Sequence, residues 1–288
     1  MDAVPADVVS LANVSSRRLR ELLHAPKILV MPGAYDVLSA RLFESMGLPA
    51  IQGTSGGIAA VHGLYDEELL GRERTAEVYR AMVAAVAVPV NADGEKGYGG
   101  PDEIEETVRR FVGVGLAGMN LEDSDYHAHG APMTLAPLDV QLAKIRAFMD
   151  AKRELRSEFF LNARVDVFGT VPDHRAGMDE VIRRGNSYAE AGADCIFIFR
   201  PGDASTIGTL VREIHAPLSV LATDDTPSVP ELEDLGVARV SYGAAFSRHA
   251  ISAVKELADV LLETGDPRPV LKSDMPRPEL QSLLRGIE

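Results

Sequence analysis

The sequence predicts an α/β fold, a single TIM-type barrel of eight parallel strands that are each followed by a helix. Eight short apolar runs rich in β-branched residues recur along the chain, and segments with helical spacing separate them. The length of 288 residues fits one barrel of this kind. An open, doubly wound sheet is the alternative. It is less favoured because no G-x-G-x-x-G pattern follows the first run.

The eight runs read as nearly continuous apolar segments, as expected for strands that helices cover. In chain order the expected strands are 28–33, 49–54, 88–93, 118–123, 159–166, 194–199, 217–223 and 238–243. Helical spacing between them is found at 34–47, 67–86, 101–115, 138–155 and 178–192. This alternation of expected strands and helices is the order that a closed parallel barrel requires.

The C-terminal end breaks this pattern, because a proline-containing polar stretch precedes a short amphipathic segment. We therefore expect a barrel domain over residues 1–265 and a helical tail over 266–288. Such a tail cannot form a core alone, so we expect it to pack on the barrel or on a neighbouring subunit. A frayed terminus is equally compatible with this composition.

Composition excludes several classes of protein. The chain has 43 acidic against 29 basic residues and a net charge of −14, which disfavours binding to nucleic-acid phosphates or anionic membrane surfaces. No stretch has the length of a membrane helix, and the first residues do not resemble a signal peptide. With Cys195 as its single cysteine, which we expect to be buried in a strand, the chain fits a reducing, cytoplasmic setting.

Acidic side chains gather where the expected strands end. Asp93 and Glu95 follow the third strand, and Glu122 ends the fourth. Because the carboxyl ends of barrel strands converge on one mouth, these carboxylates should lie close together, which is unfavourable without a compensating cation. Oxygen ligands of this type suit Mg²⁺ better than zinc. The alternative is an acidic rim that pairs with Arg164 and Lys96.

Two further features suggest an anion site at the same mouth. Thr54, Ser55 and Gly56 follow the second strand and offer backbone N–H groups, although such a segment is also a common tight turn. Arg164 lies among apolar neighbours on the fifth strand, and a desolvated guanidinium needs an anionic partner. That partner is either a substrate carboxylate or a structural Asp.

At these residues the sequence resembles the phosphoenolpyruvate mutase and isocitrate lyase superfamily, over roughly residues 28–250. The segments that carry the resemblance are PGAYDVLSARL, GTSGGIAAVHGLYD, PVNADGEKGYGG, GMNLEDS and LNARVDVF, in that order. The family's Asp-x-Asp-x-Gly-Tyr-Gly metal motif corresponds without a gap to residues 93–99. Glu95 stands where the family has its second Asp.

The resemblance implies a Mg²⁺ ion held by Asp93, Glu95 and Glu122, largely through waters, with Asp66 as a further acid of the same shell. It also implies a substrate bound by the following residues: Thr54, Ser55, Gly56, Asp66 and Arg164. The bound ion would chelate a small oxygenated carboxylate and stabilise an enolate. A homotetramer, often with C-terminal helices exchanged between subunits, is implied as well.

The sequence departs from the family on the loop after the fourth strand, which reads SDYHAHGAPM. The lyases carry a catalytic cysteine segment there, and the mutases carry Lys where this chain has Ser124. Neither is present. The remaining candidates for a general acid or base are Tyr126, His127 and His129 on that loop, and Tyr35 after the first strand, of which Tyr35 and His127 are our catalytic predictions.

The leading hypothesis is therefore a Mg²⁺-dependent lyase that cleaves a carbon–carbon bond of a small 2-hydroxy or 2-oxo di- or tricarboxylate, by retro-aldol cleavage or decarboxylation. Carbon–phosphorus chemistry of the phosphonopyruvate hydrolase or mutase type is the first alternative. A non-catalytic member that binds a keto acid is the second. In each case we expect a small-molecule ligand and a homo-oligomer, a dimer or a tetramer.

Overall fold

The computed structural model describes residues 4–125, 132–171, 173–272 and 275–284 of the chain. Its main sheet is parallel, with nine strands in the order β1-β11-β10-β9-β8-β5-β4-β3-β2. The strands are β1 Leu29–Met31, β2 Gly33–Ala34, β3 Ile51–Gly53, β4 Val90–Asp93, β5 Gly118–Glu122, β8 Phe160–Val165, β9 Cys195–Ile198, β10 Leu218–Leu221 and β11 Arg239–Ser241. All eight predicted strands are confirmed.

The sheet closes into a barrel through its first strand. β1 and β2 are separated by Pro32 alone and belong to one predicted run, 28–33. β1 pairs with β11, and β2 pairs with β3. The strand order given above begins with β1 and ends with β2, so its two ends meet in one stretch of chain. Proline has no N–H to give to a neighbouring strand, which accounts for the break in pairing at this point. The predicted α/β barrel is therefore confirmed.

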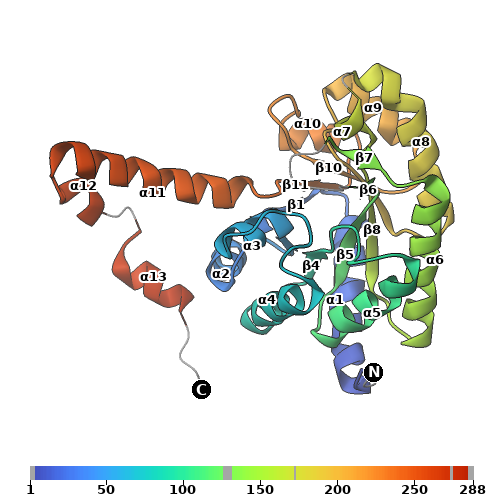
Figure 1. Cartoon of the computed structure of the whole chain (residues 1–288), viewed down its shortest axis with the longest axis horizontal. Coiled ribbons are helices and arrows are strands. Elements are labelled where there is room, and N and C mark those ends of the chain that lie inside the picture. Colours follow the sequence, from blue (N-terminus) through green and yellow to red (C-terminus); the bar gives the residue numbers. More distant parts are fainter. Residues whose placement is uncertain (1–3, 126–131, 172, 273–274, 285–288) are drawn as a thin grey trace.

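Helices surround the barrel, as Figure 1 shows. Those that follow the strands are α2 Val37–Ser45, α3 Ser55–Val61, α4 Arg72–Ala85, α5 Pro101–Gly113, α6 Leu138–Glu154, α7 Val167–Thr170, α8 His174–Glu190, α9 Ala204–Glu213 and α10 Val229–Asp234. The five predicted helical segments correspond to α2, α4, α5, α6 and α8. A small antiparallel pair, β6 Ser124–Asp125 and β7 Thr134–Leu135, lies outside the barrel sheet.

Sequence reasoning missed the first helix, α1 Ala6–Leu23, which covers the amino end of the barrel. Its Leu19 and Leu23 belong to a buried cluster with residues at the starts of strands, including Leu29 and Phe160. The Ser16 hydroxyl donates a hydrogen bond of 2.7 Å to the carbonyl of Ala117 just before β5. With the amino end closed in this way, the carboxyl ends of the strands are the open end of the barrel.

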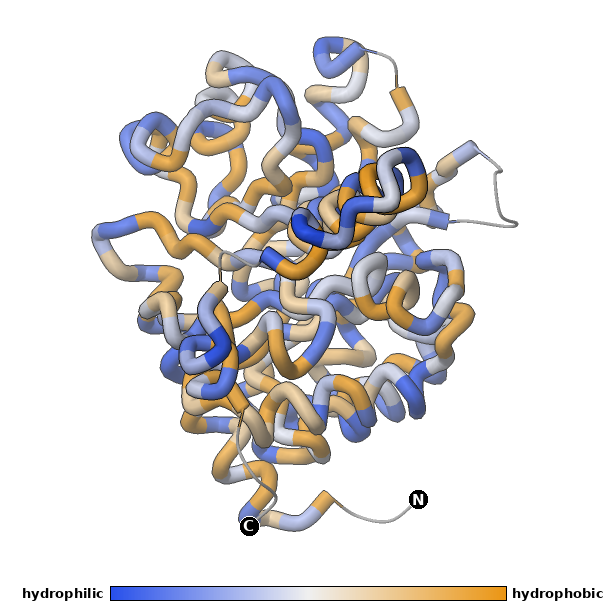
Figure 2. Tube along the Cα trace, turned by 90° about the vertical axis from the view of Figure 1, so that its left-hand side faces the viewer, coloured by the Kyte–Doolittle hydropathy of each residue, from blue (hydrophilic) through white to orange (hydrophobic). Residues whose placement is uncertain are grey.

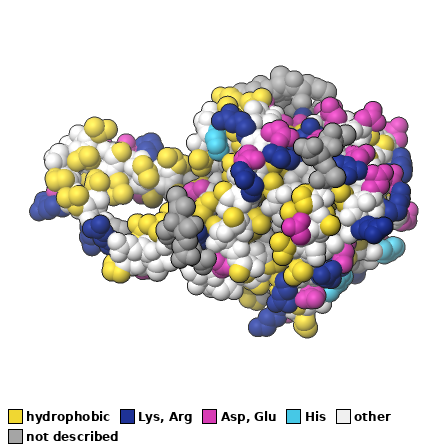
Figure 3. All heavy atoms as spheres, turned by 90° about the horizontal axis from the view of Figure 1, so that it is seen from below, with side chains coloured by type: hydrophobic (Ala, Val, Ile, Leu, Met, Phe, Trp, Pro, Cys, Tyr) yellow, Lys and Arg dark blue, Asp and Glu magenta, His cyan; other side chains and the backbone are white. Residues whose placement is uncertain are grey.

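The C-terminal helices leave the body of the barrel (Figure 1). They are α11 Ala245–Thr264, α12 Arg268–Leu271 and α13 Arg277–Leu283. No residue of α11 is buried, although apolar side chains recur along it at helical spacing. Figure 2 looks at this helix nearly end-on, with both hydrophobic and hydrophilic residues in its turns, and Figure 3 shows hydrophobic side chains gathered on the projecting arm.

The C-terminal helices contact α2 of the body. The ring of Phe246 meets that of Phe43 on α2 edge-to-face, with 5.1 Å between centroids, and Arg41 Nη1 donates to the carbonyl oxygen of Leu283 at 3.0 Å. α11 ends at Gly265, whose φ of 65° is a left-handed conformation that glycine adopts without strain. The division into a barrel of 1–265 and a tail of 266–288 stays a prediction. In the described part of the chain, no helix has the length and apolarity needed to cross a bilayer.

Candidate active site

A cavity of about 220 Å³ opens at the carboxyl ends of the barrel strands. Its wall includes five of the residues predicted from the sequence, namely Thr54, Gly56, Asp66, Asp93 and Arg164. They come from segments that are far apart in the chain and that the sheet order places side by side. The structure thus brings most of the predicted site together at one mouth, as the barrel geometry requires.

Asp93, the last residue of β4, is the acid best placed to bind a cation. Its Oδ2 accepts a hydrogen bond of 2.9 Å from the Ser55 hydroxyl, while its Oδ1 is buried and has no hydrogen-bond partner among the described residues. The backbone of Asp93 is held by the buried Tyr79 of α4, whose hydroxyl oxygen accepts from the Asp93 N–H at 2.8 Å. One carboxylate oxygen is therefore oriented and the other is left for a ligand.

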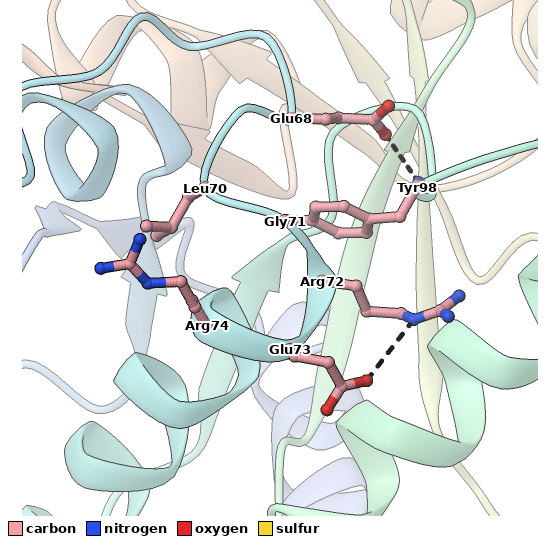
Figure 4. A pocket seen from close by; sticks show the side chains of 7 residues that line it. All are labelled: Glu68, Leu70, Gly71, Arg72, Glu73, Arg74 and Tyr98. Carbon is pink, nitrogen blue, oxygen red and sulfur yellow. Dashed lines mark hydrogen bonds and ion pairs between the residues drawn. The ribbon is translucent and has the colours of Figure 1, made fainter.

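Glu95 is buried beside the cavity and is bound by the loop that precedes α4. Its carboxylate accepts from the Glu68 N–H at 2.5 Å and from the Tyr98 hydroxyl at 3.3 Å. Figure 4 shows the return contact, in which the Glu68 carboxylate accepts from the backbone N–H of Tyr98 at 2.6 Å. Glu68, Glu95 and Tyr98 all have positive φ, at 58°, 48° and 61°. This paired contact holds two loops in backbone conformations that are uncommon for residues other than glycine.

Glu122, at the end of β5, forms an ion pair with Arg164. Arg164 Nη1 lies 2.5 Å from Glu122 Oε2, and Nη2 lies 2.7 Å from Asp166 Oδ1. Burial alone would lower the pKa of Arg164, but Asp166 and Glu122 outweigh it and hold this pKa above its ordinary value. The structure shows the structural carboxylates as partners, because Nε, Nη1 and Nη2 of Arg164 each face Asp166 or Glu122. Binding of a substrate carboxylate by Arg164 stays a prediction.

Repulsion among the acids shows in their pKa values. Burial, and then the charges of Asp66 and Asp93, raise the pKa of Glu95 to about 9. Burial and the charge of Asp93 also raise the pKa of Asp66, although its side chain is exposed at the cavity and water there screens part of this effect. Acids with raised pKa values gathered at one mouth are the electrostatic condition that a bound cation relieves.

The carboxylates at the cavity are oxygen ligands of the kind that Mg²⁺ prefers. Among the described residues, no three His, Cys, Asp or Glu side chains lie close enough together to hold one ion directly. Mg²⁺ does not need such a cage, because it commonly binds through one or two carboxylates and keeps several waters. The partnerless Oδ1 of Asp93 can serve as a direct ligand. Asp66, Glu95 and Glu122 would then act through water, and the metal roles implied for them stay predictions.

Small residues shape the cavity entrance. A Cβ on Gly56 would lie 2.9 Å from Asp66 Oδ2, so a side chain there would displace this acid. A Cβ on Gly53 would lie 2.1 Å from the Tyr79 ring and would displace the residue that holds Asp93. Ser55 begins α3 and directs its hydroxyl to Asp93 rather than to a ligand. The segment is therefore more than a tight turn, because it orients the acid.

Of the predicted proton-transfer residues, the structure describes Tyr35 alone. Tyr35 is half-buried and is not among the residues that line the cavity. Burial, and then the charge of Asp36, raise its pKa. His127 lies outside the described residues, as do Tyr126 and His129. The roles of Tyr35 and His127 stay predictions.

Sequence reasoning missed one whole side of the cavity. This side is an apolar wall. It consists of Phe197 on β9, Phe199 directly after β9, and Leu221 at the end of β10. In the sequence they belong to continuous apolar runs that look like ordinary core. The strand period of two indicates that alternate residues face the barrel interior, and this was the available signal. The floor contains Gln52 and Asn120.

The sequence profile described as phosphoenolpyruvate phosphomutase matches residues 19–262. The chain therefore belongs to this family, and the resemblance to the phosphoenolpyruvate mutase and isocitrate lyase superfamily is confirmed.

The similar proteins include both a lyase and a phosphomutase. The chain is 29% identical to 2,3-dimethylmalate lyase from Eubacterium barkeri, over 95% of each protein. It is 32% identical to phosphoenolpyruvate phosphomutase from Streptomyces hygroscopicus, over 83% of this chain and 78% of that protein. Among solved structures, oxaloacetate acetylhydrolase in complex with the product oxalate superposes with a TM-score of 0.82 at 26% identity, over 93% of each chain.

Proposed function

We propose that this protein is a Mg²⁺-dependent lyase that cleaves a carbon–carbon bond of a small 2-hydroxy or 2-oxo acid, by retro-aldol cleavage or decarboxylation through an enolate. The observation that supports it best is the buried, partnerless Oδ1 of Asp93, which lies at a cavity with Arg164 on the same wall. A cation site beside an anion site is what a chelated oxygenated carboxylate requires. The lyases among the relatives support the same reaction class.

Each residue then has a task that its contacts support. Asp93 would bind the ion directly, and Ser55 would hold the carboxylate of Asp93 in place. The N–H groups of Arg164 that do not face Glu122 or Asp166 would bind the carboxylate of the acid. When bound, Mg²⁺ would supply positive charge that favours an enolate over its parent acid. Phe197 and Phe199 would keep water from the reacting carbon.

The test is proton NMR of the purified protein with Mg²⁺ and a panel of acids. The panel contains oxaloacetate, isocitrate, 2-methylisocitrate, dimethylmalate, citramalate and phosphonopyruvate, each with a chelator-treated sample beside it. We expect metal-dependent formation of a 2-oxo acid or another cleavage product from at least one carbon acid. Turnover of phosphonopyruvate alone would instead assign carbon–phosphorus chemistry, in line with the phosphomutase relative.

The variant Asp93→Asn keeps the shape of the side chain and removes its charge. We expect it to lower metal-dependent turnover by at least a hundredfold, because Asp93 is the direct ligand in this proposal. Asp179→Asn, which removes an exposed acid on α8, is the matched control and should keep full activity. Equal activity of Asp93→Asn and wild type would contradict the metal role of Asp93. Oxalate binding without turnover of any acid would favour the non-catalytic alternative.

We also propose that the protein is a homo-oligomer in which α11 is covered by a second copy of the chain. Ile251, Val254, Leu257 and Leu261 recur at helical spacing along α11, and all four are exposed. An apolar stripe on a projecting helix is typical of an interface between subunits. Sedimentation velocity tests the proposal. Leu257→Glu should shift the protein towards monomer, whereas Glu256→Gln, on the neighbouring position, should not.

A further inference from the structure

Two buried arginines come from strands of the barrel, and they differ in how their charge is balanced. Arg164 on β8 is paired with Glu122 and with Asp166. Arg239, the first residue of β11, is fully buried, and its Nε and Nη1 have no hydrogen-bond partner among the described residues. Its Nη2 donates to an uncharged amide. In the described part of the chain, therefore, no carboxylate is hydrogen-bonded to Arg239.

Arg239 lies directly below the floor of the cavity. Its Nη2 donates to Oε1 of Gln52 on β3, and its Cζ lies 6.0 Å from the ring centroid of Phe197. Both of these residues line the cavity, whereas Arg239 does not. Ser241, two residues further along β11 and therefore on the same face of the strand, lines it as well. One layer of side chains thus separates the guanidinium from the space that a ligand would occupy.

The guanidinium of Arg239 keeps its charge at neutral pH. Burial lowers the pKa of Arg239 to about 10, and the carboxylate of Asp93 opposes this change. A buried positive charge without an ion-pair partner is unfavourable. An anionic ligand in the cavity would compensate this charge, because a dry layer of side chains screens a Coulomb interaction much less than water does.

The contact with Arg239 also fixes which way the amide of Gln52 faces. Arginine donates hydrogen bonds and cannot accept them, so the oxygen of Gln52 must be the atom that faces it. The same oxygen accepts from Nδ2 of Asn91 at 2.9 Å. Nε2 of Gln52 donates one hydrogen to the carbonyl of Gly53 at 2.6 Å. Because Gln52 lines the cavity, its second N–H is available to a ligand there.

Buried amides extend this network across the interior of the barrel. Nδ2 of Asn91 also donates to Oδ1 of Asn120 at 3.0 Å, and Nδ2 of Asn162 donates to the same oxygen at 2.8 Å. The hydrogen bonds thus run from Arg239 on β11 through Gln52 to β8. Rotation of the Gln52 amide would break several of them, so the network holds its nitrogen in one orientation.

We propose that Gln52 binds an anionic oxygen of the ligand through its second N–H, and that Arg239 is a positioning residue that fixes this amide and places a buried positive charge beneath the ligand. The inference rests on the proposed function for the presence of an anionic ligand. It gives the cavity floor an anion-binding element besides Arg164. Such a site suits an acid that carries a second negatively charged oxygen in addition to its first carboxylate.

The experiment is isothermal titration calorimetry in Mg²⁺ with oxalate and with oxamate, in which an amide replaces one carboxylate of oxalate. We expect Arg239→Met to weaken oxalate binding about tenfold and oxamate binding roughly threefold, because oxamate carries half the charge. Ser219→Ala is the matched control, since it removes a neutral buried group from the position that pairs with Arg239, and it should keep both affinities. Equal losses for the two ligands would show that Arg239 is structural alone and would overturn the inference.

A second variant keeps the buried charge paired. Gln52→Glu places a carboxylate against Arg239, so the charge is balanced within the protein while the N–H donor is lost. We expect oxalate binding to fall at least tenfold and the melting temperature to stay near that of wild type. Unchanged oxalate affinity in this variant would contradict the roles of both residues. In the double variant Gln52→Met with Arg239→Met, the losses should be less than additive, because the two residues act through one contact.

The outcomes also separate this inference from the proposed function. If wild type binds neither oxalate nor oxamate in Mg²⁺, the proposed cation site is wrong and the inference fails with it. If wild type binds oxalate, and Arg239→Met and Gln52→Glu bind it with equal affinity, the inference alone is overturned and the proposed cation site stands.

Discussion

Asp93 owes its geometry to residues that would not bind a ligand themselves. Ser55 orients its side chain, and Tyr79 holds its backbone by two hydrogen bonds, from the Asp93 N–H at 2.8 Å and to the Asp93 carbonyl at 3.3 Å. Tyr79 is fully buried on α4, so water cannot replace the hydrogen bonds of its hydroxyl. Among the described contacts, this hydroxyl makes the only side-chain hydrogen bonds between α4 and the end of β4. Removing it would break both of them.

We therefore expect Tyr79→Phe to weaken Mg²⁺ binding by about tenfold, the lower end of the effect seen for residues that orient metal ligands. The free energy of unfolding should fall by about 1 kcal/mol. Calorimetry with Mg²⁺ and oxalate measures the first quantity, and urea denaturation the second. A loss of stability with unchanged metal affinity would show that Tyr79 is structural alone. Tyr188→Phe, a buried tyrosine away from Asp93, is the control for stability.

Cys195 is buried at the start of β9, as predicted, and its thiol is protected. Burial raises its pKa to about 12, so the thiolate is scarce at neutral pH. We expect a chromogenic disulfide reagent to leave the native protein unlabelled at pH 8 and to label one thiol per chain in denaturant. Rapid labelling of the native protein would contradict this burial. The cytoplasmic setting that the single cysteine suggests stays a prediction.

At the scale of elements, the strand ends and the loops after them position the site jointly. β3 approaches α4 so closely that a Cβ on Gly53 would meet the Tyr79 ring at 2.1 Å. A glycine is needed here for contact distance, because its backbone must lie against a buried ring. This contact connects the sheet to the helix that holds Asp93.

Gly53→Ala should therefore act on Asp93 through Tyr79. We expect it to lower the free energy of unfolding by about 1–3 kcal/mol, the usual effect of overpacking in a core. Because the ring must move, Mg²⁺ affinity should fall as well. In the double variant with Tyr79→Phe, the losses of affinity should be less than additive. Fully additive losses would show that the two residues act independently. Gly113→Ala, at the end of α5 where a Cβ would lie 3.9 Å from the nearest packed side chain, that of Val4, tests the effect of the substitution itself.

At the scale of the whole molecule, the acids make stability depend on pH. The pKa of Glu95 is raised to about 9 in the folded protein, from an ordinary value near 4.5, and that of Asp66 is raised as well. The folded state thus retains protons that the unfolded state has lost. Stability contributed by these protons is fully present below about pH 4.5 and is lost as pH rises through 9.

We expect the melting temperature of chelator-treated protein to fall between pH 6 and pH 9. Addition of Mg²⁺ should raise it more at pH 9 than at pH 6, because the ion competes with fewer protons at high pH. Differential scanning fluorimetry in buffers of equal ionic strength measures both effects. In Glu95→Gln the slope should be smaller. A melting temperature of chelator-treated wild type that rises over this range would contradict the raised pKa of Glu95.

The sequence by itself determined the barrel and the acids at its mouth. The period of apolar runs, the polar residues at strand ends and the motif at 93–99 are local patterns, and local patterns can be recognised without coordinates. Asp93 and Arg164 were found in this way, Asp66 was implied by the family resemblance, and all three line one cavity.

Only the tertiary structure decided what faces those acids. Phe197, Phe199 and Leu221 read as core until closure of the sheet turns them towards the cavity. The contact of Tyr79 with Asp93, like the contact of Glu68 with Glu95, joins residues from different elements and depends on how helices and loops pack. The position of helix α1 over the amino end of the barrel likewise depends on packing between segments that are far apart in the chain. Such contacts depend on distance in space, which spacing along the chain does not encode.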